Sequence, residues 1–158
     1  MKAIFLDIDG VIVTPTSLQS NAALGREPEE FRCDRVSLAY LGQLVARTGA
    51  KVVLSSSWRG DLDTRDPLLG AIVGNLLHQL EAVGAPLFDV TPSLPGADRS
   101  AEIGAWLDEH PSEAYVILDD RARFEERPEV AKGHLVLIEN SDGIRQEHFC
   151  RALDVLNA

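Results

Sequence analysis

Cysteine is scarce in this sequence, which contains only Cys33 and Cys150 among its 158 residues. Two cysteines are too few for a disulfide framework or a zinc site, and so low a number is typical of a reducing compartment. Long apolar runs are also missing. None approaches the ~20 residues of a membrane-spanning helix, so we do not expect a membrane protein. The first apolar stretch ends at Asp7 and is too short for a signal-peptide core, so we expect the protein in the cytoplasm.

Positive charge is outnumbered as well. Fifteen Lys and Arg residues stand against 25 Asp and Glu residues, which gives a net charge of −10. This balance opposes broad, non-specific binding of a nucleic-acid backbone, although it leaves room for a local basic pocket. The hydrophobic share of 45% is ordinary for a globular protein, and the length corresponds to one domain of roughly 150 residues. We predict a single domain over residues 1–158.

Short apolar runs recur along the chain, at residues 3–6, 51–54, 115–118 and 134–138, with a fifth candidate at 86–90. Continuous runs of this length are typical of strands buried on both faces of a parallel sheet. Between them, apolar residues recur at helical spacing in 36–45, 69–80 and 103–107, and a last helix is expected over about 143–156. The alternation predicts an α/β fold with a parallel sheet between two layers of helices.

One segment differs from this pattern. From about Asp9 to Asp34 the sequence shows neither a clear helix nor a buried strand. Structureless loops of this length are uncommon in compact domains and are usually functional. We therefore predict a functional loop directly after the first strand.

Acidic and hydroxyl residues follow three of the predicted strands: Asp7 and Asp9, then Ser55, Ser56 and Ser57, then Asp119 and Asp120. Parallel strands end at one edge of a sheet, where open α/β folds bind their ligands. Strand alternation places Asp7 and Asp9 on the same side. We expect four carboxylates to meet at this edge, where their repulsion requires a cation, and Mg²⁺ suits such oxygen ligands.

Each of these residues also has a structural explanation. Asp-Gly after an apolar run is a common turn, and Ser or Asp after a strand commonly caps the next helix. Capping and phosphate binding are compatible, because a helix N-terminus also favours a bound phosphate.

The order of these motifs resembles the haloacid dehalogenase-like (HAD) superfamily of phosphohydrolases. The matching residues are an Asp-x-Asp-Gly motif, a serine, a basic residue and an acidic pair, at Asp7–Gly10, Ser55, Arg99 and Asp119–Asp120. The resemblance extends over nearly the whole chain. It implies a three-layer Rossmann-like fold and Mg²⁺-dependent hydrolysis of phosphate monoesters. Ser56 stays an alternative to Ser55.

The same resemblance implies a role for each residue. Asp7 attacks phosphorus and forms an aspartyl-phosphate, which water then hydrolyses. Asp9 protonates the leaving oxygen and later deprotonates the water. Ser55 and Arg99 stabilise charge on the phosphoryl oxygens. The implied Mg²⁺ ligands are Asp7, the Asp9 carbonyl, Asp119 and Asp120.

A narrower likeness is carried by short stretches, namely Gly25–Pro28, Cys33-Asp34, Asp98-Arg99 with Glu102-Ile103 and Trp106, and Leu118–Arg121. They are similar to the phosphatase domain of polynucleotide kinase-phosphatases and to the HAD domains of bacterial RNA-repair proteins. This likeness implies a substrate that is a nucleotide or the phosphorylated end of a polynucleotide.

The gaps between the motifs predict an open site. The first gap, 10–34, is too short for a folded cap domain, and 60–98 is largely accounted for by one helix and one strand. An open crevice admits a polymer end. Ser56 is expected beside the phosphate pocket. Arg26 and Arg59 either lie beside the same pocket or are solvated surface residues, and Trp58 either packs on the sheet or stacks on the last base.

Three other functions stay open. A transferase would pass the phosphoryl group to an acceptor other than water. A small-metabolite phosphatase would use the same chemistry on a compact substrate. A regulatory module of a repair assembly would bind phosphate or metal without turnover, although such a module does not need an acid-base residue at Asp9.

Overall fold

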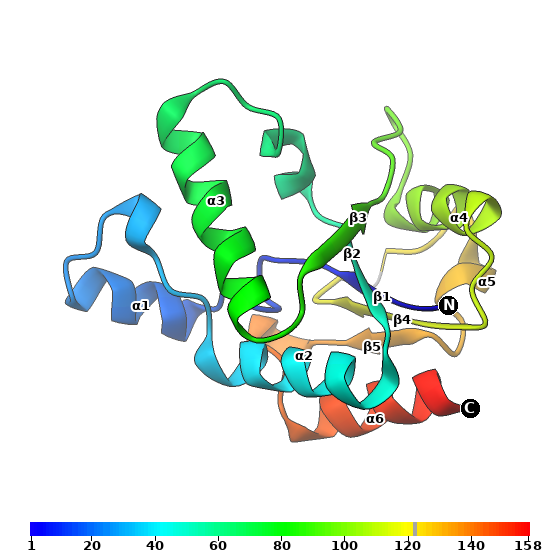
Figure 1. Ribbon diagram of the computed structural model, residues 1–158. Helices are drawn as coiled ribbons and strands as arrows, with labels where there is room; N and C mark the ends of the chain where they lie inside the picture. The colour runs from blue at the N-terminus through cyan, green and yellow to red at the C-terminus, as the bar shows by residue number, and fades with distance from the viewer. Residues whose placement is uncertain (122) are drawn as a thin grey trace.

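The computed structural model describes residues 1–121 and 123–158, and within them the chain forms one five-stranded parallel sheet between helices (Figure 1). The strand order is β3-β2-β1-β4-β5. The strands are β1 (Lys2–Leu6), β2 (Lys51–Leu54), β3 (Leu87–Val90), β4 (Ala114–Asp119) and β5 (Leu135–Leu137). The five predicted strands and the parallel α/β arrangement are thus confirmed.

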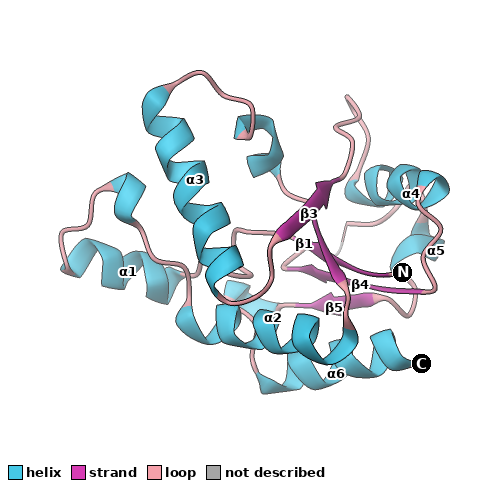
Figure 2. Ribbon diagram, in the orientation of Figure 1, coloured by secondary structure: helices cyan, strands magenta, loops and turns pink. Residues whose placement is uncertain are grey.

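The helices cover both faces of this sheet (Figure 2). They are α1 (Pro15–Ala23), α2 (Arg35–Thr48), α3 (Pro67–Ala82), α4 (Arg99–Glu109), α5 (Pro128–Ala131) and α6 (Gln146–Asn157). Short 3₁₀ turns lie at η1 (Pro28–Glu30), η2 (Ser57–Asp61) and η3 (Glu139–Ser141). No helix of the described residues combines the length and the apolar composition needed to cross a membrane.

Side-chain alternation in β1 separates the two cores. Ile4 and Leu6 point into the larger core, which is completed by α2, α3 and α6. Ala3 and Phe5 point to the other face, where α4 and α5 cover them. Because all four residues are fully buried, β1 is enclosed on both sides, as its continuous apolar run predicts.

Three helices begin at an aspartate. Asp34, Asp66 and Asp98 each accept a hydrogen bond from a backbone N–H in the first turn of α2, α3 and α4, at 2.8, 3.0 and 3.1 Å. Each carboxylate satisfies a donor that the helix itself leaves unpaired. The cap at Asp98 decides where Arg99 lies, because Arg99 is the first residue of α4.

The segment from Asp9 to Asp34 is not a structureless loop, so that prediction is wrong. It contains α1 and η1. Hydrophobic periodicity does not mark α1, because the residues that it buries are the polar Ser17 and Asn21. The start of α1 is nevertheless encoded, since Thr14 and Ser17 form a reciprocal capping box.

Candidate active site

Three carboxyl groups of the described residues meet at the carboxyl edge of the sheet. Asp7, Asp119 and Asp120 each offer an oxygen atom, and these atoms all lie within 4.8 Å of one another. Asp7 follows β1, and Asp119 ends the neighbouring β4. The backbone N–H of Asp7 donates to the carbonyl oxygen of Leu118 at 3.0 Å, which holds the two strand ends together. Parallel pairing therefore brings these acids into one group.

Arg99 connects this acidic group to the end of β2. Its Nη1 atom donates to Asp7 Oδ1 at 3.3 Å, to Asp119 Oδ2 at 3.2 Å and to the carbonyl oxygen of Ser55. The Arg99 side chain is 18% exposed, so the guanidinium is partly desolvated. One cation at the start of α4 thus offsets part of the negative charge that the sheet edge collects.

Burial makes the ionised state of this group unfavourable. It raises the pKa of Asp7 to about 7, and the charge of Asp119 acts in the same direction, while Arg99 opposes both. Burial also raises the pKa of Asp119. Since neighbouring buried carboxylates repel one another, a bound cation would favour the ionised form of both.

The donor set fits a divalent cation. All three side chains offer carboxylate oxygens, and Asp120 Oδ1 is buried without a hydrogen-bond partner among the described residues. The other oxygen, Asp120 Oδ2, accepts a hydrogen bond from Ser141 Oγ at 2.9 Å, which fixes the carboxylate. Oxygen ligands of this kind suit Mg²⁺.

Asp9 does not join the three acids, so the prediction of four converging carboxylates is wrong. Its side chain is exposed, and Asp9 Oδ2 accepts a hydrogen bond from Trp58 Nε1 at 3.1 Å. Strand alternation fails here because β1 ends at Leu6. A tight turn follows, in which the carbonyl oxygen of Ile8 accepts from three backbone N–H groups at 3.0–3.2 Å.

Gly10 allows this turn to pass close to Asp120. Its φ of +81° lies in the left-handed region. A Cβ atom at this position would collide with Asp120 Oδ2 and with the side chain of Ser141. Glycine is therefore required for both conformation and space.

The serines after β2 differ in what their hydroxyls do. Ser55 Oγ is buried and has no hydrogen-bond partner among the described residues. Ser56 Oγ accepts from the backbone N–H of Trp58 at 3.3 Å and caps η2. The hydroxyl of Ser55 is thus the one left free for a ligand.

A cavity of about 420 Å³ adjoins this group, and Arg99 and Asp119 line it. Arg59 lies in its wall, where its Nη2 donates to Glu102 Oε1 at 2.6 Å and its Nη1 donates to the carbonyl oxygen of Ser56 at 3.2 Å. The exposed Arg121 and Arg123 line the same cavity. The sequence did not lead us to expect a substrate contact from either arginine, although Arg121 directly follows the acidic pair and Arg123 lies two residues further on.

Trp58 packs against the fold and is half-buried. It is partly buried against the larger core, and its ring centroid lies 5.9 Å from that of Phe31. Of the two alternatives for Trp58, packing on the fold is the one that the structure shows.

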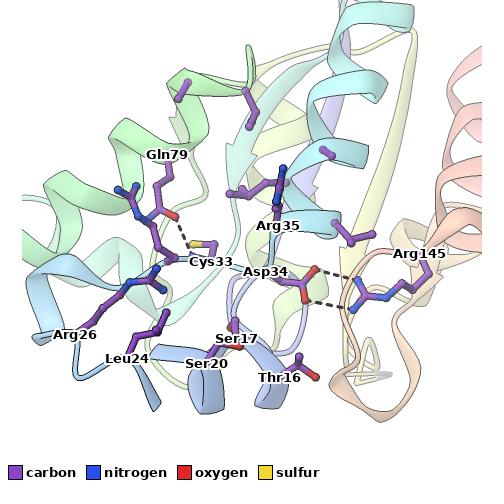
Figure 3. A pocket seen from close by; sticks show the side chains of 16 residues that line it. Thr16, Ser17, Ser20, Leu24, Arg26, Cys33, Asp34, Arg35, Gln79 and Arg145 are labelled. Atoms are coloured by element: carbon purple, nitrogen blue, oxygen red, sulfur yellow. Dashed lines mark hydrogen bonds and ion pairs between the residues drawn. The ribbon is translucent and has the colours of Figure 1, made fainter. Parts of the chain in front are cut away.

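Arg26 does not line the cavity beside the three acids, so its predicted placement beside the phosphate pocket is wrong. It lines a different cavity between α1, α2 and α3 (Figure 3). Its Nη1 donates to Asn21 Oδ1 at 3.1 Å, and its backbone N–H donates to the carbonyl oxygen of Asn21 at 3.1 Å. The unpredicted helix α1 explains the difference, because it carries this part of the chain away from the acids.

Asp98 ties two loops of the site together. Asp98 Oδ1 caps α4, and Asp98 Oδ2 accepts from the backbone N–H groups of Glu125 and Glu126 at 2.6 and 2.9 Å. Burial opposes ionisation, but the hydrogen bonds from Ser100 and from the three backbone N–H groups hold the pKa of Asp98 at about 2. The loop after β4 is therefore attached to the residue that precedes Arg99.

Comparison with known proteins agrees with this geometry. A search of curated proteins finds no match. A family model described as the HAD domain in Swiss Army Knife RNA repair proteins matches residues 3–149, which include all the acids of the site and Arg99. The chain belongs to this family of HAD domains from RNA repair proteins.

Proposed function

We propose that this chain is a metal-dependent phosphatase that removes a terminal phosphate from a polynucleotide. The observation that carries the proposal is the meeting of Asp7, Asp119 and Asp120 within 4.8 Å, with Arg99 bonded to two of them. Membership of a HAD family from RNA repair proteins supports both the chemistry and the class of substrate.

Asp7 is the proposed nucleophile. One of its carboxylate oxygens attacks phosphorus, the bond from phosphorus to the ester oxygen breaks, and an aspartyl-phosphate forms. Burial disfavours the anionic form of Asp7 that this step requires. A divalent cation held by Asp7, Asp119 and Asp120 would supply the positive charge that keeps Asp7 ionised and neutralises the phosphoryl group.

Asp9 is the proposed acid and base. Its carboxyl group donates a proton to the leaving ester oxygen, and its carboxylate then takes a proton from the water that attacks the aspartyl-phosphate. The products are the alcohol, inorganic phosphate and free Asp7. The position of Asp9 outside the group of three acids supports this role, because its exposed carboxyl group is accessible to the ester oxygen and to the attacking water.

Ser55 and Arg99 are the proposed contacts to the phosphoryl oxygens. The Ser55 hydroxyl is buried without a partner, and Arg99 already lies between Asp7 and Asp119. Both groups are held by the fold before a substrate arrives, so they stabilise developing charge at little cost in reorganisation.

The proposed polynucleotide end would lie in the cavity beside Arg99. The exposed Arg121 and Arg123, which line this cavity, provide cations for the phosphates next to the terminal one. These cations offset the net charge of −10 locally. Arg59, whose guanidinium lies in the same wall, is proposed as a further substrate contact.

The test is phosphate release from a panel that contains an aryl phosphate, sugar phosphates, nucleotides, and oligonucleotides with 3′- or 5′-phosphates. Each substrate is assayed with Mg²⁺ and with EDTA. We expect the highest kcat/KM with an oligonucleotide end, and loss of turnover with EDTA or in Asp7→Asn. Asp154→Asn, which neutralises an exposed acid on α6, is the control and keeps full activity.

Three results would contradict the proposal in different ways. No phosphate release from any member of the panel would exclude the phosphatase and favour a binding module. A clear preference for a sugar phosphate would exclude the polynucleotide end but leave the chemistry in place. Phosphoryl transfer to added alcohols in preference to water would identify a transferase.

A further inference from the structure

A second cavity lies between α1, α2 and α3 (Figure 3). Its volume is about 800 Å³. It shares no lining residue with the catalytic cavity. The proposed phosphatase chemistry therefore gives it no role.

Positive charge is concentrated around this cavity. Four of its described lining residues are arginines, and the one acidic lining residue is Asp34. Asp34 is already neutralised by a two-pronged ion pair with Arg145, at 3.0 and 3.2 Å. Arg26, Arg32 and Arg35 form no ion pair within the described residues. A chain with a net charge of −10 thus gathers three unneutralised cations at one cavity.

The unpaired cations differ in how far they are available. Arg26 already donates to Asn21, whereas the Arg32 and Arg35 side chains are exposed. Arg35 opens α2, whose N-terminus carries the positive end of the helix dipole. Guanidinium groups donate in a planar fork that matches the oxygens of a phosphate. Arg32 and Arg35 are thus the lining cations that remain available to a phosphate.

The walls of the cavity are held in place by hydrogen bonds. Asn21 on α1 donates to the carbonyl oxygen of Arg32 at 2.9 Å and accepts from its backbone N–H at 2.8 Å. Gln79 on α3 accepts from the backbone N–H of Cys33 at 2.9 Å and donates to the carbonyl oxygen of Phe31 at 2.9 Å. Both amides are buried, so the segment that carries Arg32 is fixed to both helices. The cavity is therefore formed before any ligand binds.

Part of the remaining lining is aliphatic. Leu24 and Val36 are 67% and 47% exposed, and Ala39, Ala82 and Val83 extend the same wall. An inorganic anion would leave this apolar surface in water. A ligand with an apolar or planar body would cover it, and small-molecule sites typically have volumes of about 300–1,000 Å³.

We propose that this cavity is a second binding site, which takes a phosphorylated small molecule of about the size of a nucleoside monophosphate. Arg32 and Arg35 bind the phosphate, and the body of the ligand lies on the aliphatic wall beside Val36 and Ala39. The proposal does not depend on catalysis at Asp7.

The test is calorimetric titration of the full chain with AMP, inorganic phosphate and adenosine. Arg99→Gln and EDTA are used throughout to suppress binding in the catalytic cavity. We expect AMP to bind at least 10-fold more tightly than either fragment, because only AMP uses both the cations and the apolar wall. Arg32→Gln/Arg35→Gln is expected to weaken AMP binding by at least 10-fold.

Two further variants distinguish binding at this site from an effect of overall positive charge and from a loss of folding. Arg65→Gln/Arg151→Gln removes the same charge from exposed arginines outside the cavity and is expected to change AMP binding less than 2-fold. Ala39→Trp fills the cavity from an exposed position of α2 and is expected to abolish AMP binding with an unchanged circular dichroism spectrum.

The proposal is overturned if AMP does not bind, if the Arg32/Arg35 double variant binds it unchanged, or if phosphate alone binds equally well. It is also overturned if an unphosphorylated adenosine hexanucleotide shows the arginine-dependent binding and AMP does not. When Arg99 is kept, the Arg32→Gln/Arg35→Gln variant is expected to hydrolyse an aryl phosphate as fast as the wild type. A failure of the second site is thus distinguishable from a failure of the proposed phosphatase.

Discussion

The indole nitrogen of Trp58 donates a hydrogen bond to Asp9 Oδ2 at 3.1 Å, between residues that are 49 positions apart in the sequence. Trp58 lies in η2 after β2, and Asp9 lies in the turn after β1. The bond holds the exposed Asp9 carboxylate in one orientation. Trp58 is therefore a positioning residue for the proposed acid and base.

Trp58→Phe is expected to lower kcat about 10-fold on an alkyl phosphate, since misplacing a general acid forfeits part of its roughly 10²–10⁴-fold contribution. The loss is expected to be small on p-nitrophenyl phosphate, whose leaving group needs little protonation. Steady-state kinetics with both substrates measure the difference. Equal losses on the two substrates would show that Trp58 does not act through Asp9.

Trp106→Phe is the matched control for this variant. Trp106 Nε1 also donates to a carboxylate, Asp89 Oδ2, at 2.7 Å, but Trp106 belongs to α4 and packs in the smaller core. Trp106→Phe is expected to lower the free energy of unfolding. It is not expected to change the ratio of kcat on the alkyl phosphate to kcat on p-nitrophenyl phosphate.

Asp7 is expected to make the stability of the metal-free protein depend on pH. Its pKa is raised from 3.8 to about 7, so between these values the folded protein holds a proton that the unfolded chain releases. The free energy of unfolding therefore falls as the pH rises from about 4 to 7, by roughly 1.4 kcal/mol for each unit of pKa shift. Above pH 7 this contribution is constant.

Asp7→Asn removes this titration. In EDTA, the stability of the variant relative to the wild type is expected to rise between pH 4 and 7 and then to level off. Saturating Mg²⁺ is expected to reduce the difference by stabilising the ionised wild type. Urea unfolding at several pH values measures both effects, and parallel pH profiles for the two proteins would contradict the assignment.

Gly10→Ala is expected to lower both stability and metal affinity. Its positive φ costs about 1–2 kcal/mol for a residue with a Cβ, and that Cβ collides with Asp120. Gly25→Ala is the control, because Gly25 also has a positive φ of 63° but faces open space. Metal titration should show weaker binding for Gly10→Ala only, and equal affinities in the two variants would refute the role of Gly10.

Arg59→Ala is expected to destabilise the fold by about 3–5 kcal/mol, because it leaves Glu102 buried without its cation. Arg59→Ala/Glu102→Ala is expected to recover part of this loss in urea unfolding. If Arg59 also contacts substrate, the double variant loses a larger fraction of the wild-type kcat/KM on an oligonucleotide 3′-phosphate than on an aryl phosphate. Full recovery on both substrates would leave Arg59 with a structural role only.

The sheet was predictable because its signal is local. Each strand is a short apolar run. A strand that is buried on both faces, as at Ile4 and Phe5, can be recognised from this run alone, without a polar and apolar alternation. The helix α1 was not predictable in this way, since it buries Ser17 and Asn21 and leaves Leu18 58% exposed. Its buried side chains form hydrogen bonds instead, Ser17 with Thr14 and Asn21 with the backbone of Arg32, and hydrophobic periodicity does not detect such bonds.

The candidate site likewise contains residues whose positions the sequence predicts and residues whose positions it does not. Asp7, Asp119 and Asp120 follow from the rule that parallel strands end at one edge. The orientation of Asp9 depends on a bond to Trp58, and the position of Arg26 depends on a bond to Asn21. Both bonds depend on the direction of turns, which the pattern of apolar strands does not predict. The order of residues along the chain was therefore not enough to place these two side chains.

The two hydrogen bonds from Glu125 and Glu126 to Asp98 have a consequence for redesign of the rim of the catalytic cavity. The segment before α4 and residues Glu125 and Glu126 after β4 share one anchor at Asp98, so a displacement of either segment is passed to the start of the helix that bears Arg99. A loop exchanged from a related domain would keep Arg99 in register only if both segments were transplanted together.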